Sequence, residues 1–226
     1  MDDLKADVDA RFDLLGLPSW ADPHAGRPDR SPAEEEYSRL TDPGRHAVVH
    51  ERARVWAQVL SERAGARVDR LPPEPARRVD DEVVGFDRGV RVASPLPGTM
   101  PLLLLERDVP VGSDEVLPVL AVAVVRPEVL LAQWPDCGCD ACDSGSADLL
   151  EALDRSVREI VGGPCVVLRG RGWGAQWVPD GGSAYSRGHT RDDFRALMEV
   201  CRHLAAGEDV ALPDGATAFV GRAWLA

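Results

Sequence analysis

The fold is decided by the stretch VLPVLAVAVVRPEVLLAQW, residues 116–134. β-Branched and leucine side chains dominate both halves of this stretch, and the Arg126-Pro127 pair between them favours a turn. The two halves therefore predict a β-hairpin at the centre of a sheet. Residues 119–125 lack polar alternation, which indicates a strand that is covered on both faces.

Helical and extended patterns flank this hairpin on both sides. Residues 146–161 repeat apolar side chains every three to four positions, with Ser146 as the expected cap, and this spacing predicts a helix. Asp42 and Pro43 are typical of a second helix start. The mixed order of elements predicts an α+β fold with a mixed or mainly antiparallel sheet, three main helices and an N-terminal helical arm. Further helices are expected at 2–15 and after Thr190, and strands at 66–71, 89–93, 165–169, 175–178 and 217–224.

The chain divides by composition into two parts. We expect residues 1–36 to form an N-terminal amphipathic helix and a Pro-rich acidic arm, and residues 37–226 to form a single α+β domain. Half of the net charge of −12 lies in the first 44 residues, and we interpret this segment as a solvated arm. The acidic balance argues against nucleic acid as a partner, because phosphate contacts depend on clustered Lys and Arg.

The sequence also predicts a cellular compartment. No apolar run approaches the roughly 20 residues of a membrane-spanning helix, and the first residues lack the basic and apolar regions of a secretory signal. We therefore expect a cytoplasmic protein that does not enter a membrane. In that reducing compartment five cysteines are more typical of metal ligands, nucleophiles or core residues than of disulfides.

Three of these cysteines form the motif Cys137-Gly-Cys139-Asp-Ala-Cys142. A turn with this spacing can direct several sulfur atoms at one ion, and thiolates favour zinc or an iron–sulfur cluster. We predict Cys137, Cys139 and Cys142 as metal ligands, with zinc as the candidate ion. The sequence leaves the fourth ligand open among His46, His50, His189, His203, Cys165, Cys201 and a neighbouring aspartate.

Charge separates the chemical interpretations of this loop. Between Asp136 and Asp154 there are six acidic residues and no basic one, so we expect metal-free thiols to be protonated and slow as nucleophiles. This ranks a metal site above a redox centre. Cys165 and Cys201 are interpreted as core residues, and His203 is expected to pair with Glu199 one helical turn away.

Other motifs predict no catalytic residue. Residues 170–174 are rich in glycine but no helix follows them, so they predict a hairpin turn rather than a phosphate loop. Ser183, Tyr185 and His189 lack the Gly-x-Ser-x-Gly turn that would present a nucleophile, and we assign no triad.

The cysteine loop also carries a resemblance. The Cys-Gly-Cys-Asp-Ala-Cys-Asp run at 137–143, the preceding hairpin and residues 37–45 resemble a bacterial family of unknown function over roughly residues 37–180. The resemblance implies no activity.

Three hypotheses of function follow from these patterns. The first is a non-catalytic or regulatory protein-interaction module with a structural metal site at the cysteine loop. The second is a metal- or thiol-dependent enzyme or redox protein that uses Cys137, Cys139 and Cys142. The third is an acidic inhibitor or immunity-type protein that binds a basic partner.

Overall fold

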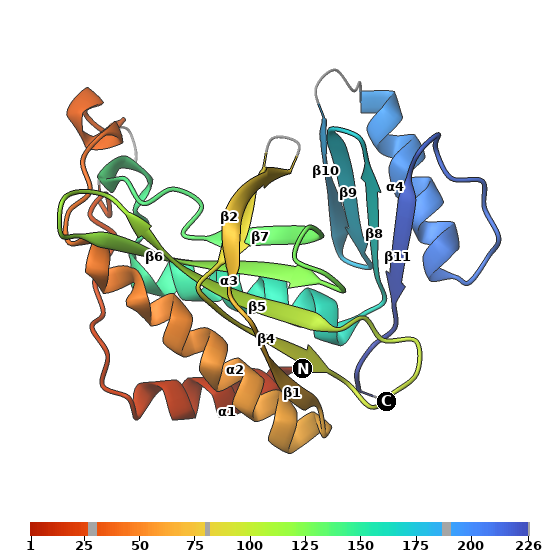
Figure 1. The fold of residues 1–226 in the computed structure, drawn as a ribbon, viewed down its shortest axis with the longest axis horizontal. Coiled ribbons are helices and arrows are strands. Elements are labelled where there is room, and N and C mark those ends of the chain that lie inside the picture. Colours follow the sequence, from red (N-terminus) through yellow and green to blue (C-terminus); the bar gives the residue numbers. More distant parts are fainter. Residues whose placement is uncertain (27–30, 80–81, 187–190, 226) are drawn as a thin grey trace.

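A computed structural model describes residues 1–26, 31–79, 82–186 and 191–225 (Figure 1). The fold is α+β, with every strand pair of the described residues antiparallel, as the sequence predicts. The helices are α1 Asp2–Asp13, α2 Val48–Ala64, α3 Gly145–Gly162 and α4 Arg191–Ala205. The strands are β1 Arg67–Leu71, β2 Glu74–Val79, β3 Glu82–Phe86, β4 Arg88–Ala93, β5 Leu102–Pro110, β6 Val116–Val124, β7 Leu130–Trp134, β8 Cys165–Gly170, β9 Trp173–Val178, β10 Gly181–Ser186 and β11 Thr217–Gly221.

The larger sheet has five strands in the order β1-β4-β5-β6-β7. The predicted hairpin of β6 and β7 forms, but the expectation that it lies at the sheet centre is wrong, because β7 is an edge strand and β5 is central. The sequence analysis missed β5 altogether. Its four leucines, 102–105, are buried on both sheet faces and therefore show no alternation that would distinguish a strand from a helix.

Helices α1, α2 and α3 cover one face of this sheet (Figure 1). The inner face of α2 packs into this core, since Val49, Trp56 and Leu60 are fully buried. Leu4 and Val8 of α1 lie in the same core, so the first helix packs against the main sheet layer. Gly65 ends α2 in the left-handed conformation that favours glycine, at φ 62°.

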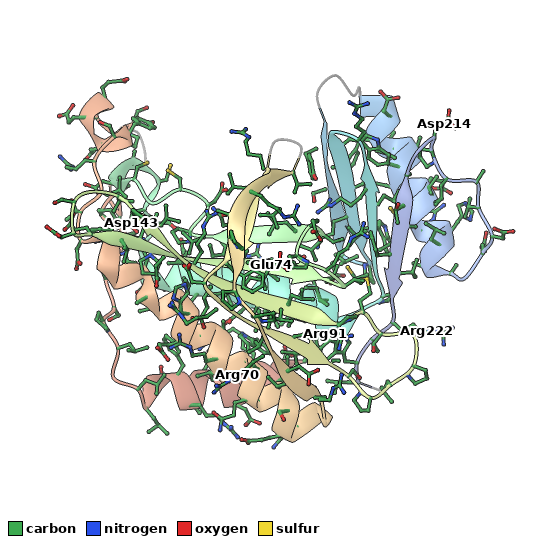
Figure 2. All side chains as sticks on the ribbon, viewed as in Figure 1. Arg70, Glu74, Arg91, Asp143, Asp214 and Arg222 are labelled. Carbon is green, nitrogen blue, oxygen red and sulfur yellow. The ribbon has the colours of Figure 1, made fainter. Side chains whose placement is uncertain are left out.

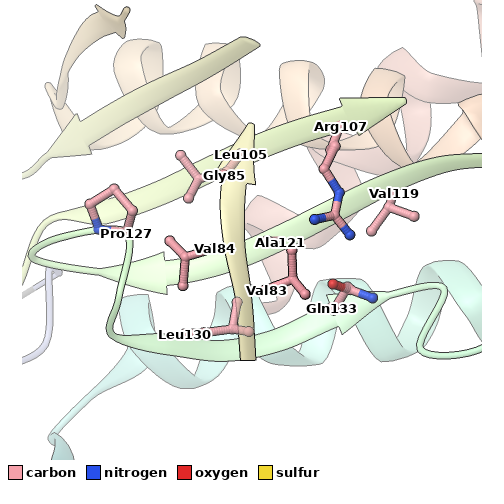
Figure 3. A pocket seen from close by; sticks show the side chains of 10 residues that line it. All are labelled: Val83, Val84, Gly85, Leu105, Arg107, Val119, Ala121, Pro127, Leu130 and Gln133. Atoms are coloured by element: carbon pink, nitrogen blue, oxygen red, sulfur yellow. The ribbon is translucent and has the colours of Figure 1, made fainter. Parts of the chain in front are cut away.

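A second hairpin, β2–β3, crosses the opposite face of the sheet (Figure 3). The sequence predicts no strand between residues 71 and 89, so it does not indicate this hairpin. Phe86 packs with Leu103, Leu105 and Ala123 beneath the hairpin, and the remaining cavity there is only about 10 Å³. The hairpin supplies the cover that the apolar run in β6 requires.

The smaller sheet has four strands in the order β10-β9-β8-β11. Cys165 and Val167 of β8 face the core that includes α3, while Val166 and Leu168 face α4. This alternation explains why β8 is apolar throughout. The sequence analysis predicted β8, β9 and β11 but missed β10.

Two predicted helix caps are wrong. Asp42 makes no capping hydrogen bond and has φ 50°, and a 3₁₀ turn over Pro43–Ala47 precedes α2. The hydroxyl of Ser146 instead exchanges hydrogen bonds of 3.1 Å with the backbone of Trp20. Ser146 therefore anchors residues far away in the sequence. Thr190, the expected start of the last helix, lies outside the described residues.

Candidate metal centre

The cysteine loop connects β7 to α3 at one end of the larger sheet (Figure 1). A short 3₁₀ turn, Asp140–Cys142, directs Cys142 back towards Cys139, whose carbonyl accepts a 3.0 Å hydrogen bond from the Cys142 backbone N–H. The loop passes close to β6 at Gly138, where a side-chain methyl group would lie 2.6 Å from Cδ2 of Leu117. A larger residue at this bend would therefore have to displace the side chain of Leu117.

The structure brings together the three thiols that the sequence predicts as ligands. The Sγ atoms of Cys137, Cys139 and Cys142 all lie within 4.8 Å of one another, and Cys137 and Cys139 are 3.2 Å apart. Two sulfur ligands of one tetrahedral zinc ion are about 3.8 Å apart, given Zn–S bonds of about 2.3 Å. The thiols therefore fit a single ion after small side-chain rotations. Cys139 is buried, whereas Cys137 and Cys142 are exposed.

Asp140 holds the loop against the N-terminal part of the chain. Its carboxylate is oriented towards Arg39 and Thr41, accepting from Arg39 Nε at 2.5 Å and from the Thr41 backbone and hydroxyl at 2.7 and 2.8 Å. Burial acts to raise the pKa of this carboxyl, but the hydrogen bonds from Arg39 and Thr41 outweigh burial and lower it. Asp140 is therefore a structural anchor of the loop.

Asp143, which is labelled in Figure 2, makes a second connection of the same kind. Its Oδ1 accepts from Trp20 Nε1 and from the Gly145 backbone at 2.9 Å, and its Oδ2 accepts from Arg45 at 2.5 Å. Gly145 has φ 88°, and a methyl group there would lie 2.6 Å from the backbone nitrogen of Asp22. Part of the segment that the sequence analysis interpreted as a solvated arm thus packs against the cysteine loop.

These ion pairs change the electrostatics that the sequence suggested. Arg39 and Arg45 compensate the charges of Asp140 and Asp143, so the repulsion expected from these two carboxylates is offset. Burial raises the pKa of the Cys139 thiol, but hydrogen bonds from the other two thiols and from backbone N–H groups lower it overall. The hydrogen bond with Cys139, together with burial, raises the pKa of Cys142 to about 12. The neighbouring thiols thus shift the pKa values of Cys139 and Cys142 in opposite directions.

The other predicted fourth ligands lie in different surroundings. His46 contacts the carbonyl of Pro43, and burial lowers its pKa. His50 bonds to the Val119 carbonyl at 2.9 Å, and His203 pairs with Glu199 at 3.0 Å as predicted. His189 lies outside the described residues.

The two remaining cysteines are core residues, as the sequence analysis proposed. Cys165 on β8 is fully buried in the main core with α3, and Cys201 on α4 is fully buried between α4 and the smaller sheet. Burial raises the pKa of Cys165 to about 12 and that of Cys201 to about 11, so both favour the neutral thiol.

His24 is a neighbour of the loop that the sequence analysis missed. Its Nε2 lies 3.0 Å from the backbone carbonyl of Asp140, 116 positions away in the sequence. No local pattern around His24 indicates this contact, because tertiary packing alone creates it. The glycine-rich turn at 170–174 joins β8 to β9 as predicted.

Fold and cluster together define an α+β protein that carries a surface loop of three convergent cysteines. The chain belongs to a family of unknown function, DUF6226, whose model matches residues 8–226. The match confirms the resemblance and extends it at both ends beyond residues 37–180. No curated protein and no solved structure matches the chain significantly. Among the described residues no helix is long and apolar enough to cross a bilayer.

Proposed function

We propose that this protein is a non-catalytic, regulatory protein-interaction module whose cysteine loop holds one zinc ion through Cys137, Cys139 and Cys142. The convergence of three Sγ atoms within 4.8 Å carries the proposal. Thiolates are ligands that zinc prefers, and binding would displace the thiol protons while the cation offsets the charge of the thiolates that form.

The surroundings of the loop support a structural role for the ion. Asp140 and Asp143 attach the loop to Arg39 and Arg45, so an ion that rigidifies the loop also stabilises the docking of the N-terminal segment. Five free thiols agree with a reducing compartment, and we place the protein in the cytoplasm. Its net charge of −12 favours a basic protein surface over nucleic acid as the partner.

Elemental analysis of protein purified anaerobically without chelator tests the metal. We expect one zinc per chain, and thiols that react with a thiol reagent faster after chelation. Cys142→Ser should lose the zinc, whereas the buried control Cys201→Ala should retain it. A metal-free protein whose loop thiols titrate freely refutes the zinc site.

A pull-down at low and at high salt tests the partner. A charge-steered complex weakens as salt screens its charges, so capture that is unchanged at high salt contradicts the acidic-surface interpretation.

A thiol-dependent redox protein is the second candidate. The 3.2 Å separation of the Cys137 and Cys139 sulfurs and the lowered pKa of Cys139 favour it. Iron with broad visible absorption in the purified protein would support a cluster instead of zinc.

A further inference from the structure

We propose that the metal ion at Cys137, Cys139 and Cys142 keeps a fourth coordination position open to solvent, which takes a cysteine thiolate or a histidine imidazole from outside the chain. This inference rests on the proposed metal site and names the chemistry by which that site recognises a partner. Three protein ligands and one exchangeable position are typical of zinc sites that react or exchange ligands, whereas purely structural sites are closed by four protein ligands.

In the part of the chain that the structure describes, the cluster has three donors. Among the described residues, no His, Asp or Glu side chain and no further Cys joins the three sulfurs within 4.8 Å. A fourth ligand from residues 1–26, 31–79, 82–186 or 191–225 would therefore require a rearrangement beyond a side-chain rotation of the three cysteines.

The nearest carboxylates are already committed elsewhere. Both oxygens of Asp140 accept hydrogen bonds from Arg39 or Thr41, and both oxygens of Asp143 accept them from Trp20, Gly145 or Arg45. Turning Asp143 towards the ion would break its ion pair with Arg45, and turning Asp140 would leave Arg39 with only the longer contact to Glu36, at positions where both aspartates are largely buried. The aspartates thus anchor the loop and supply no oxygen ligand to the ion.

His24 is the strongest internal alternative. It lies beside the loop, but its Nε2 is 3.0 Å from the Asp140 carbonyl, and neither ring nitrogen lies within 4.8 Å of all three sulfurs. The described histidines 46 and 50 are buried against backbone carbonyls of Pro43 and Val119. An imidazole from another molecule is not held by these contacts to backbone carbonyls.

The exposure of the three cysteines indicates that the open coordination position faces solvent. Cys139 is 5% exposed and lies on the protein side of the cluster, whereas Cys137 and Cys142 are exposed. An ion bound between them has its fourth position on the solvent side. Because a three-thiolate set is soft, a sulfur or imidazole donor competes there better than a carboxylate or chloride.

Cobalt-substituted full-length protein tests this inference. Co²⁺ alone is added to metal-free protein, and the visible d–d bands and thiolate charge-transfer bands are followed while 2-mercaptoethanol, imidazole or acetate is titrated in. We expect one cobalt per chain and bands that shift, to saturation at one ligand per cobalt, with the thiol or with imidazole but not with acetate. His24→Ala should behave like the wild type.

The outcomes separate the two proposals. One cobalt per chain with bands that no added ligand shifts overturns the open position but leaves the metal site intact. Bands of a three-sulfur, one-nitrogen site that change in His24→Ala also overturn it, because the chain then closes the site itself. No cobalt binding refutes the metal site. A cobalt-dependent dimer in gel filtration with a four-sulfur spectrum supports the open position and assigns the donor to a second copy.

Discussion

Asn in place of Asp154 should destabilise the protein more than any conservative surface change. Asp154 lies on α3 at 1% exposure, and its carboxylate accepts from Arg52 Nε and Nη2 at 2.9 and 2.5 Å and from Trp56 Nε1 at 2.6 Å. Arg52 also contacts Asp9, and Lys5 lies 3.6 Å from Asp154. This network joins α1, α2 and α3 through one buried carboxylate.

The magnitude follows from the burial of Arg52. Its side chain is 4% exposed, so Asp154→Asn leaves a buried guanidinium with only the partly exposed Asp9 as counter-charge. Breaking a buried ion pair from one side costs about 3 to 5 kcal/mol, and we expect about 3 because the amide oxygen can still accept from Trp56. For a chain of this length, about 3 kcal/mol lowers Tm by roughly 6 to 12 °C.

Urea denaturation followed by tryptophan fluorescence measures this loss. The matched control is Glu62→Gln in the exposed Arg11–Glu62 pair, which should leave the unfolding midpoint unchanged. A double-mutant cycle with Arg52→Met should show that the two changes together cost less than the sum of each alone. An Asp154→Asn variant within about 1 kcal/mol of wild type, with additive effects, would refute the reasoning.

Three further changes test other contacts. Burial acts to raise the pKa of Glu106, but hydrogen bonds from two arginines lower it below its ordinary 4.5. The ionised Glu106 therefore stabilises the fold fully above pH 4.5, and this stabilisation is lost as the pH falls through the lower pKa of the folded state. We expect the difference in urea midpoint between wild type and Glu106→Gln to shrink on acidification. Gly145→Ala places a methyl group on a residue in the left-handed conformation, close to the Asp22 backbone, and should lower the free energy of unfolding by about 2 kcal/mol. Residues 14–26 should then be cleaved faster by proteases. Unchanged proteolysis would contradict the packing of this segment against the start of α3. Asp140→Asn should weaken zinc binding about tenfold or more in a chelator competition, whereas the exposed Asp148→Asn should not.

Local pattern was sufficient for elements whose two faces differ in polarity. The apolar spacing of α3 and the inner face of α2 predict helices that the structure contains, because a helix between core and solvent must segregate its side chains. The same reasoning failed for β5 and for the β2–β3 hairpin. In β5 both faces are buried, and the polar residues of β2, one strand of the cover hairpin, resemble a loop.

The candidate site, too, can be predicted from the sequence only in part. Its three ligands follow from sequence, because only three intervening residues separate the cysteines and keep them close together wherever the loop lies. Its surroundings do not, since Arg39, Arg45 and His24 reach the loop across about a hundred positions. The division at residue 36 between an arm and a domain stays a prediction.

The sequence by itself determined the α+β class, the family and the three thiols, because these depend on composition, periodicity and near-neighbour spacing. Only the tertiary structure decided that the acidic loop is compensated by arginines, that Asp154 joins three helices, and that no fourth ligand lies beside the thiols among the described residues. The physical reason is that hydrogen bonds and ion pairs act over only a few ångströms, and folding alone brings residues that are distant in sequence within that distance.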